Sequence, residues 1–93
     1  MTYQSTNPYN GQVLQTFQDI SDAQLQTKLQ RAADCFENEW RATPFAQRSA
    51  ILSRAAALMR ERSQEFAELI TLEMGKLLRQ SRGEVALSAA ILD

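Results

Sequence analysis

The sequence predicts a mainly helical fold with a short β-hairpin at its N-terminus. Residues 2–18 place β-forming side chains on either side of a turn-forming segment. Residues 21–93 carry apolar side chains at helical spacing on about four amphipathic segments, which capping and turn residues separate. We therefore expect a hairpin over residues 1–18 and a helical scaffold over residues 21–93.

The hairpin prediction depends on three consecutive motifs. The first and third, "TYQST" and "QVLQTFQ", are rich in β-formers, and "NPYNG" between them collects residues that set turn dihedrals. Asn10-Gly11 is the strongest local turn signal. Because a lone hairpin is marginally stable in water, we expect this one to lie against another part of the protein.

The first helix begins after Ser21, which forms a capping box with Gln24. Its apolar stripe then recurs at helical spacing. The stripe comprises Leu25, Leu29, Ala32, Ala33, Phe36 and Trp40. Such spacing indicates that Phe36 and Trp40 belong to a core and do not form an aromatic binding platform.

Turn and cap residues delimit the next two helices. Thr43 is expected to cap a helix that has Pro44 in its first position. Ser63 is expected to cap a third helix after a break, and Gly75 to end it. The two apolar stripes are Ile51, Leu52, Ala55, Leu58 and Met59, and then Phe66, Leu69 and Ile70.

A fourth helix is predicted to begin near Leu77, with Val85, Ala89 and Leu92 on one face. Its pattern continues to the last residue without a glycine, an asparagine, a proline or a basic last turn. We therefore expect the chain to be a fragment, or to need a partner that covers this stripe. A frayed natural terminus is the alternative.

Composition excludes several classes of function. The net charge is -1 with no basic excess, which argues against a nucleic-acid partner. The sequence has no apolar run long enough to span a membrane, and "MTYQSTNPYN" is not a signal peptide. One cysteine in 93 residues fits a reducing compartment, so we expect a cytoplasmic protein.

The residues that carry most enzyme chemistry are missing. The sequence contains no histidine and no glycine-rich phosphate loop. Cys35 lies in the first helix near Asp34, Glu37 and Glu39, whose charges disfavour a thiolate, so we expect a half-buried structural side chain. The arginines are predicted to form a solvated face. They are Arg48, Arg54, Arg60, Arg62, Arg79 and Arg82. We assign no catalytic and no cofactor-binding residue.

Glu73 stands in the last turn of the third helix, where the helix dipole disfavours a carboxylate. An ion pair with Lys76 is the interpretation that the residues alone favour. A bound cation or a donor from a partner remains the alternative.

Taken in order, these motifs resemble the N-terminus of an NAD(P)-dependent aldehyde dehydrogenase. The resemblance covers the whole chain and depends on "NPYNGQVLQTF", Trp40-Arg41, the segment from Arg48 to Arg54 and "ELITLEMGK". "LEMGK" and "SRGEV" are most similar to the succinate-semialdehyde dehydrogenase branch. Leu77 departs from the proline or threonine that often follows Gly-Lys in that family.

The resemblance implies that the helices belong to the α/β, Rossmann-like cofactor-binding domain of a longer enzyme. That enzyme would oxidise an aldehyde, such as succinate semialdehyde, to the acid with NAD or NADP. Its catalytic residues and cofactor-binding strands would lie downstream of Asp93, so the chain alone would be inactive and bind no cofactor. Its partners would be the remainder of the polypeptide and further copies of the enzyme. A free-standing helical interaction module, pairing through the fourth helix, is the alternative.

The resemblance also implies a monovalent cation, Na⁺ or K⁺, at the end of the third helix. Its ligands would include the Glu73 carboxylate and the main-chain carbonyl of Thr6. Hard cations take such oxygen ligands.

Overall fold

The computed structural model describes residues 2–93 and confirms the predicted class. A two-stranded antiparallel hairpin precedes four α-helices, with one short 3₁₀ helix between the first two. The elements are β1 (Thr2–Thr6), β2 (Val13–Gln18), α1 (Asp22–Asn38), η1 (Trp40–Ala42), α2 (Phe45–Glu61), α3 (Ser63–Met74) and α4 (Leu78–Leu92).

The hairpin closes where the turn residues predicted it. The strands pair from Thr2 opposite Gln18 to Thr6 opposite Val13, with an irregularity after Ser5. Across the loop, the Asn7 amide donates to the Gln12 carbonyl over 2.8 Å. Gly11 has a φ of 73°, a conformation that costs glycine little.

Two of the predicted helix boundaries are confirmed in detail. Ser21 and Gln24 form both halves of the capping box: the Gln24 amide donates to Ser21 Oγ, and the Ser21 amide donates to Gln24 Oε1. Gly75 ends α3 in the left-handed conformation, with φ 72° and ψ 16°. The break before α3 is also present, at Arg62.

The two other predicted caps are wrong. Pro44 is the N-cap of α2, and the Thr43 hydroxyl donates backwards to the Glu39 carbonyl over 2.9 Å. Ser63 is already the first residue of α3, which begins without a side-chain cap. In both places a short turn of the preceding helix leads directly into the next, so the hydroxyl is not in the capping position.

The prediction that the Val85, Ala89 and Leu92 stripe is uncovered is wrong as well. Val85 is 3% exposed and Ala89 is fully buried, because α4 packs along both α2 and α3. Leu92 is half-buried. The exposed large apolar side chains of α4 are Leu87 and Ile91, 62% and 75% exposed, which lie on the opposite side of the helix.

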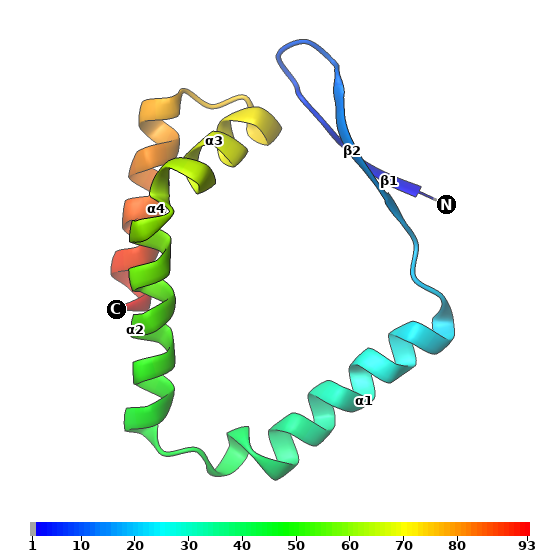
Figure 1. The fold of residues 1–93 in the computed structure, drawn as a ribbon, viewed down its shortest axis with the longest axis vertical. Helices are drawn as coiled ribbons and strands as arrows, with labels where there is room; N and C mark the ends of the chain where they lie inside the picture. The colour runs from blue at the N-terminus through cyan, green and yellow to red at the C-terminus, as the bar shows by residue number, and fades with distance from the viewer. Residues whose placement is uncertain (1) are drawn as a thin grey trace.

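The elements trace an open, flat ring (Figure 1). From the hairpin the chain passes through α1 to α2, and α3 turns back toward the hairpin while α4 lies along α2 and α3. The extents are 47 × 36 × 15 Å, so the ring is little thicker than one helix. Its radius of gyration is 17.4 Å, whereas a compact domain of this length has one of about 12 Å.

The arrangement leaves α1 unpacked. Among the described elements α1 contacts only η1, and every residue from Pro8 to Ala42 is exposed. The prediction that Phe36 and Trp40 lie in a core therefore fails within this chain, where they are 49% and 37% exposed. Cys35 is also exposed, not half-buried as predicted.

The buried core is confined to α2, α3 and α4. Its apolar members are Ala56, Ala67, Val85 and Ala89. Ser81 is buried beside them, and its hydroxyl lies 2.9 Å from Thr71 Oγ1 in a hydrogen bond. Small side chains at these positions let the helices approach closely. Within residues 2–93, no helix combines the length and apolar character that crossing a membrane requires.

Candidate functional site

The hairpin meets the C-terminal end of α3, and Glu73 lies at this junction. Ser5 in β1 donates its hydroxyl to Glu73 Oε1 over 2.8 Å. Thr6, the residue after Ser5, is half-buried and ends β1. The fold thus brings Glu73 to the strand that carries Thr6, the two residues for which the family resemblance implies a cation. Whether they bind one stays a prediction.

The expected ion pair between Glu73 and Lys76 does not form. Lys76 pairs instead with Glu84, about two turns into α4. The left-handed turn at Gly75 redirects the chain, so the lysine faces the following helix and not the preceding one. Among residues 2–93, the Glu73 carboxylate accepts a hydrogen bond from the Ser5 hydroxyl and forms no ion pair with a lysine or an arginine.

Gly75 also contacts the hairpin turn. A Cβ at Gly75 would lie 3.1 Å from Pro8 Cγ, which is closer than ordinary van der Waals contact. A shallow groove of about 360 Å³ runs beside this contact. It is lined by Asn7, Tyr9, Thr71, Leu72, Gly75, Lys76, Leu77 and Leu78. The hairpin turn and the end of α3 therefore pack closely at Pro8 and Gly75, in addition to the Ser5–Glu73 hydrogen bond.

The donor set at the junction has the chemistry of a hard-cation site, because a carboxylate and main-chain carbonyls are oxygen ligands. It is incomplete by itself. In the part of the chain that the structure describes, no group of three or more His, Cys, Asp or Glu residues could hold a metal ion. A complete site would need further oxygen ligands.

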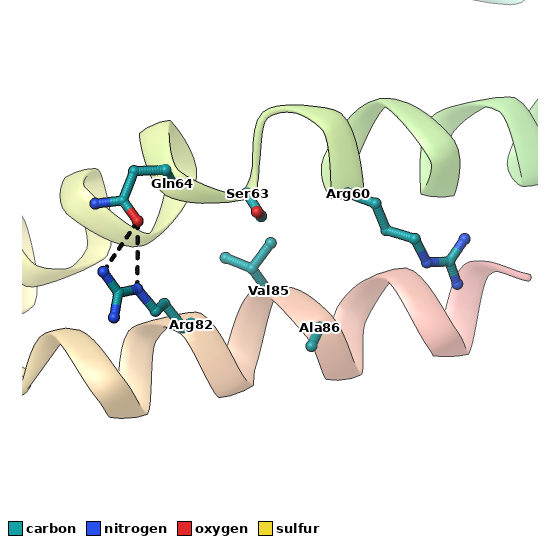
Figure 2. A pocket seen from close by; sticks show the side chains of 6 residues that line it. All are labelled: Arg60, Ser63, Gln64, Arg82, Val85 and Ala86. Atoms are coloured by element: carbon teal, nitrogen blue, oxygen red, sulfur yellow. Dashed lines mark hydrogen bonds between the residues drawn. The ribbon is translucent and has the colours of Figure 1, made fainter.

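A second groove, of about 250 Å³, lies where the bend between α2 and α3 crosses α4 (Figure 2). Val85 points from α4 toward the bend, and Arg82 donates to Gln64 Oε1 with N–O distances of 3.2 and 3.3 Å. Arg60, at the other end, pairs with Asp93 over 2.9 Å. Both arginines are exposed and pair with neighbours of this chain. That they belong to a solvated face stays a prediction.

Arg62, at the same bend, holds Glu65 in a two-bonded ion pair of 2.7 and 2.9 Å. The hydrogen bond from Arg62 lowers the pKa of the Glu65 carboxyl below its ordinary value, and the same bond raises the pKa of Arg62. The guanidinium also lies 5.2 Å from the centre of the Phe66 ring. These contacts fix the first turn of α3 in place of a capping side chain.

Comparison with known proteins gives the geometry its context. The model of the aldehyde dehydrogenase family matches residues 1–93. The chain belongs to that family. It is 47% identical over 91 residues to the succinate-semialdehyde dehydrogenase [NADP(+)] of Deinococcus radiodurans. The alignment covers 98% of this chain and 19% of that enzyme. A probable enzyme of the same name from Synechocystis is 41% identical over 85 residues, 91% of this chain and 18% of that protein.

Solved aldehyde dehydrogenases share the open ring. A structure of Gox0499, described in terms of cofactor and substrate selection, superposes with a TM-score of 0.93 at 36% identity. The succinic semialdehyde dehydrogenase of Streptococcus pyogenes, solved with NADP⁺, superposes with a TM-score of 0.89 at 37% identity. Each comparison covers 98% of this chain and 20% of the solved one. The chain thus spans about a fifth of its relatives.

Sequence reasoning missed Ser5 as the partner of Glu73. The two residues are 68 positions apart, and neither has a local pattern that signals the contact. It also placed the uncovered surface on the wrong element. One signal in the sequence did indicate a contact of this kind. A two-stranded hairpin is only marginally stable alone, so residues 2–18 are expected to pack against another part of the protein.

Proposed function

We propose that the chain is the N-terminal scaffold segment of an NAD(P)⁺-dependent aldehyde dehydrogenase. The complete enzyme would oxidise an aldehyde to the carboxylic acid, with succinate semialdehyde as the favoured substrate. The names of the relatives from D. radiodurans, Synechocystis and S. pyogenes support this substrate and support NADP⁺. A benzaldehyde dehydrogenase of Corynebacterium glutamicum, which is NAD-dependent, superposes with a TM-score of 0.85, so NAD remains the second choice of cofactor.

The observation that carries the proposal is the open shape. The ring exposes far more apolar surface than a self-contained domain of this size, yet it matches solved family members over nearly its whole length. A shape that buries little of its own surface fits a segment that is covered by the rest of a larger fold. We assign the chain the role of holding its hairpin and helices against that remainder.

The chemistry would be supplied elsewhere in the complete enzyme. The chain has no histidine and no glycine-rich loop, and its one cysteine, Cys35, lies in an acidic helix without an activating base. We therefore expect the chain alone to be inactive and to bind no NAD(P)⁺. We also propose a cytoplasmic enzyme, since a single cysteine fits a reducing compartment. We further propose that the complete enzyme is a homo-oligomer, as the family resemblance implies.

A monovalent cation, Na⁺ or K⁺, is proposed at the junction of β1 and α3. The Glu73 carboxylate and the Thr6 carbonyl would supply two oxygen ligands, and the complete enzyme the others. In the full-length protein, Glu73→Ala should then reduce the rise in melting temperature that K⁺ produces. An equal response to K⁺ in the variant and the parent would argue against the site.

The alternative is a free-standing helical interaction module that pairs through α4. The α4 stripe that this alternative would use is already covered, because Val85 and Ala89 pack against α2 and α3. A module of this kind would have to use Leu87 and Ile91 instead.

A chimera tests the proposal. The chain replaces the matching segment of the D. radiodurans enzyme, and reduction of NADP⁺ is followed with succinate semialdehyde. We expect a folded chimera that oxidises the aldehyde, while the 93-residue chain alone shows no activity. A chimera that folds and binds NADP⁺ but has no activity toward any aldehyde would overturn the proposal.

A further inference from the structure

The surface that other polypeptide would cover lies on residues 2–42, here called the docking arm. It comprises the hairpin, α1 and η1. Leu25, Leu29, Phe36 and Trp40 recur at helical spacing along one side of α1 and η1, and each is between 37% and 55% exposed. The hairpin adds further exposed apolar side chains. They are Tyr3, Val13, Leu14 and Phe17.

The amount of exposed surface is that of a large interface. The chain exposes 7559 Å², whereas a compact protein of 10.5 kDa exposes about 5,400 Å². The excess of roughly 2,100 Å² is well above the ~800 Å² that one partner contributes to an interface of standard size. It is in the range of permanent interfaces, which bury much apolar surface.

The docking arm has little to hold it in place within the chain. α1 contacts only η1 among the described elements, and β1 reaches the helices at the end of α3. Most helical stability in proteins comes from packing an amphipathic face, and a two-stranded hairpin is marginal alone. α2, α3 and α4, in contrast, bury Ala56, Ala67 and Val85 against one another.

We infer that the docking arm orders only when a complementary aldehyde dehydrogenase polypeptide covers it, whereas α2–α4 keep their packing without it. The inference rests on the proposed function for the identity of that polypeptide, whether it is continuous with this chain or separate. Two solved relatives contain the same open shape within chains of which this chain spans 20%. This favours further aldehyde dehydrogenase polypeptide as the cover, and not a second copy of this chain.

Hydrogen exchange on two proteins, the 93-residue chain and the chimera, tests this. In the chain we expect α1 amides to exchange within about tenfold of unfolded rates, while amides of α3 and α4 are more protected. In the chimera the same α1 amides should gain roughly 100-fold protection. If α1 in the chain is as protected as α4 at all concentrations, the arm is self-sufficient and the inference is overturned. Protection of α1 that rises with chain concentration would assign the arm to a second copy and overturn it too.

Two matched variants locate the surface. Leu29→Glu places a charge on the apolar side of α1, and Thr27→Glu places the same charge on the opposite side. In the chimera, Leu29→Glu should return α1 exchange toward the rate in the chain, and Thr27→Glu should not. Equal effects of the two variants would contradict the assigned face. Should Leu29→Glu prevent folding, Leu29→Ala gives the milder version of the same comparison.

The outcomes separate the inference from the proposed function. A chimera in which α1 becomes protected but which oxidises no aldehyde supports the docking arm and refutes the activity. An active chimera whose α1 amides stay unprotected refutes the docking arm and leaves the activity in place.

Discussion

The Ser5 hydroxyl donates to Glu73 Oε1 over 2.8 Å and so joins the first strand to the end of α3 across 68 positions. This hydrogen bond and the contact of Pro8 with Gly75 hold the hairpin against the C-terminal end of α3. Glu73, whose carboxylate the helix dipole disfavours, therefore has a structural role in the contact with the hairpin.

Removing the hydroxyl should loosen the hairpin. Ser5→Ala in the chimera is expected to cost about 1 kcal/mol, the usual net contribution of one hydrogen bond. That corresponds to roughly fivefold faster amide exchange in β1. Ser5→Thr, which keeps a hydroxyl, serves as the control. Identical β1 exchange in the alanine and threonine variants would show that the bond contributes nothing.

Two glycines of the chain should respond in opposite directions to the same change. Gly75→Ala forces a side chain into a left-handed conformation and should destabilise the chain by about 1–2 kcal/mol. In this structure Pro8 Cγ lies 3.1 Å from the position of the new Cβ. The loss should therefore be greater in the chimera, where we expect the hairpin to be held against α3. Gly83→Ala, in the middle of α4 with open space around its Cβ, should stabilise by about 0.5–1 kcal/mol. Urea unfolding followed by circular dichroism measures both, and a stabilising Gly75→Ala would contradict the structure.

The hydrogen-bonded pair of Thr71, which is half-buried, and Ser81, which is buried, should behave as one unit. Ser81→Ala leaves the Thr71 hydroxyl without its partner and should cost about 1–3 kcal/mol. Adding Thr71→Val, which replaces the second hydroxyl by a methyl group of similar size, should recover much of that loss. A double-mutant cycle in urea tests the coupling. Additive losses would mean that the two hydroxyls do not interact.

The bend before α3 should be sensitive to acid through Glu65. Its carboxyl has a pKa lowered from 4.5, first by the hydrogen bond from Arg62 and less by the charge of Arg62. Since the folded pKa is the lower one, the stabilisation is complete above pH 4.5 and is lost as the pH falls through the folded pKa. NMR titration should give a Glu65 midpoint below 4.5, which Arg62→Gln shifts back upward. No shift in the variant would remove Arg62 as the cause.

Local signals in the sequence predicted the elements well, because they act over a few residues. The Asn-Gly turn, the Ser21 capping box and the left-handed Gly75 all depend on neighbours within one turn of chain. The predicted caps Thr43 and Ser63 are wrong because the N-cap positions are one residue away from them, at Pro44 and Arg62. The Thr43 hydroxyl donates instead to the carbonyl of Glu39.

Contacts between elements could not be predicted in the same way. The periodicity of α4 marked Val85 and Ala89 as apolar but did not say whether α2 and α3 or other polypeptide would cover them. At the candidate site, Glu73 and Thr6 came from the family resemblance, whereas Ser5 is visible only once the hairpin is folded against α3.

Small-angle X-ray scattering of the 93-residue chain tests the central claim most directly. A chain that does not fold its docking arm against itself should scatter as a monomer with a radius of gyration at or above the 17.4 Å of the open ring. A monomer near 12 Å, the value for a compact domain of this length, would mean that the chain buries its own apolar surface and would contradict the account.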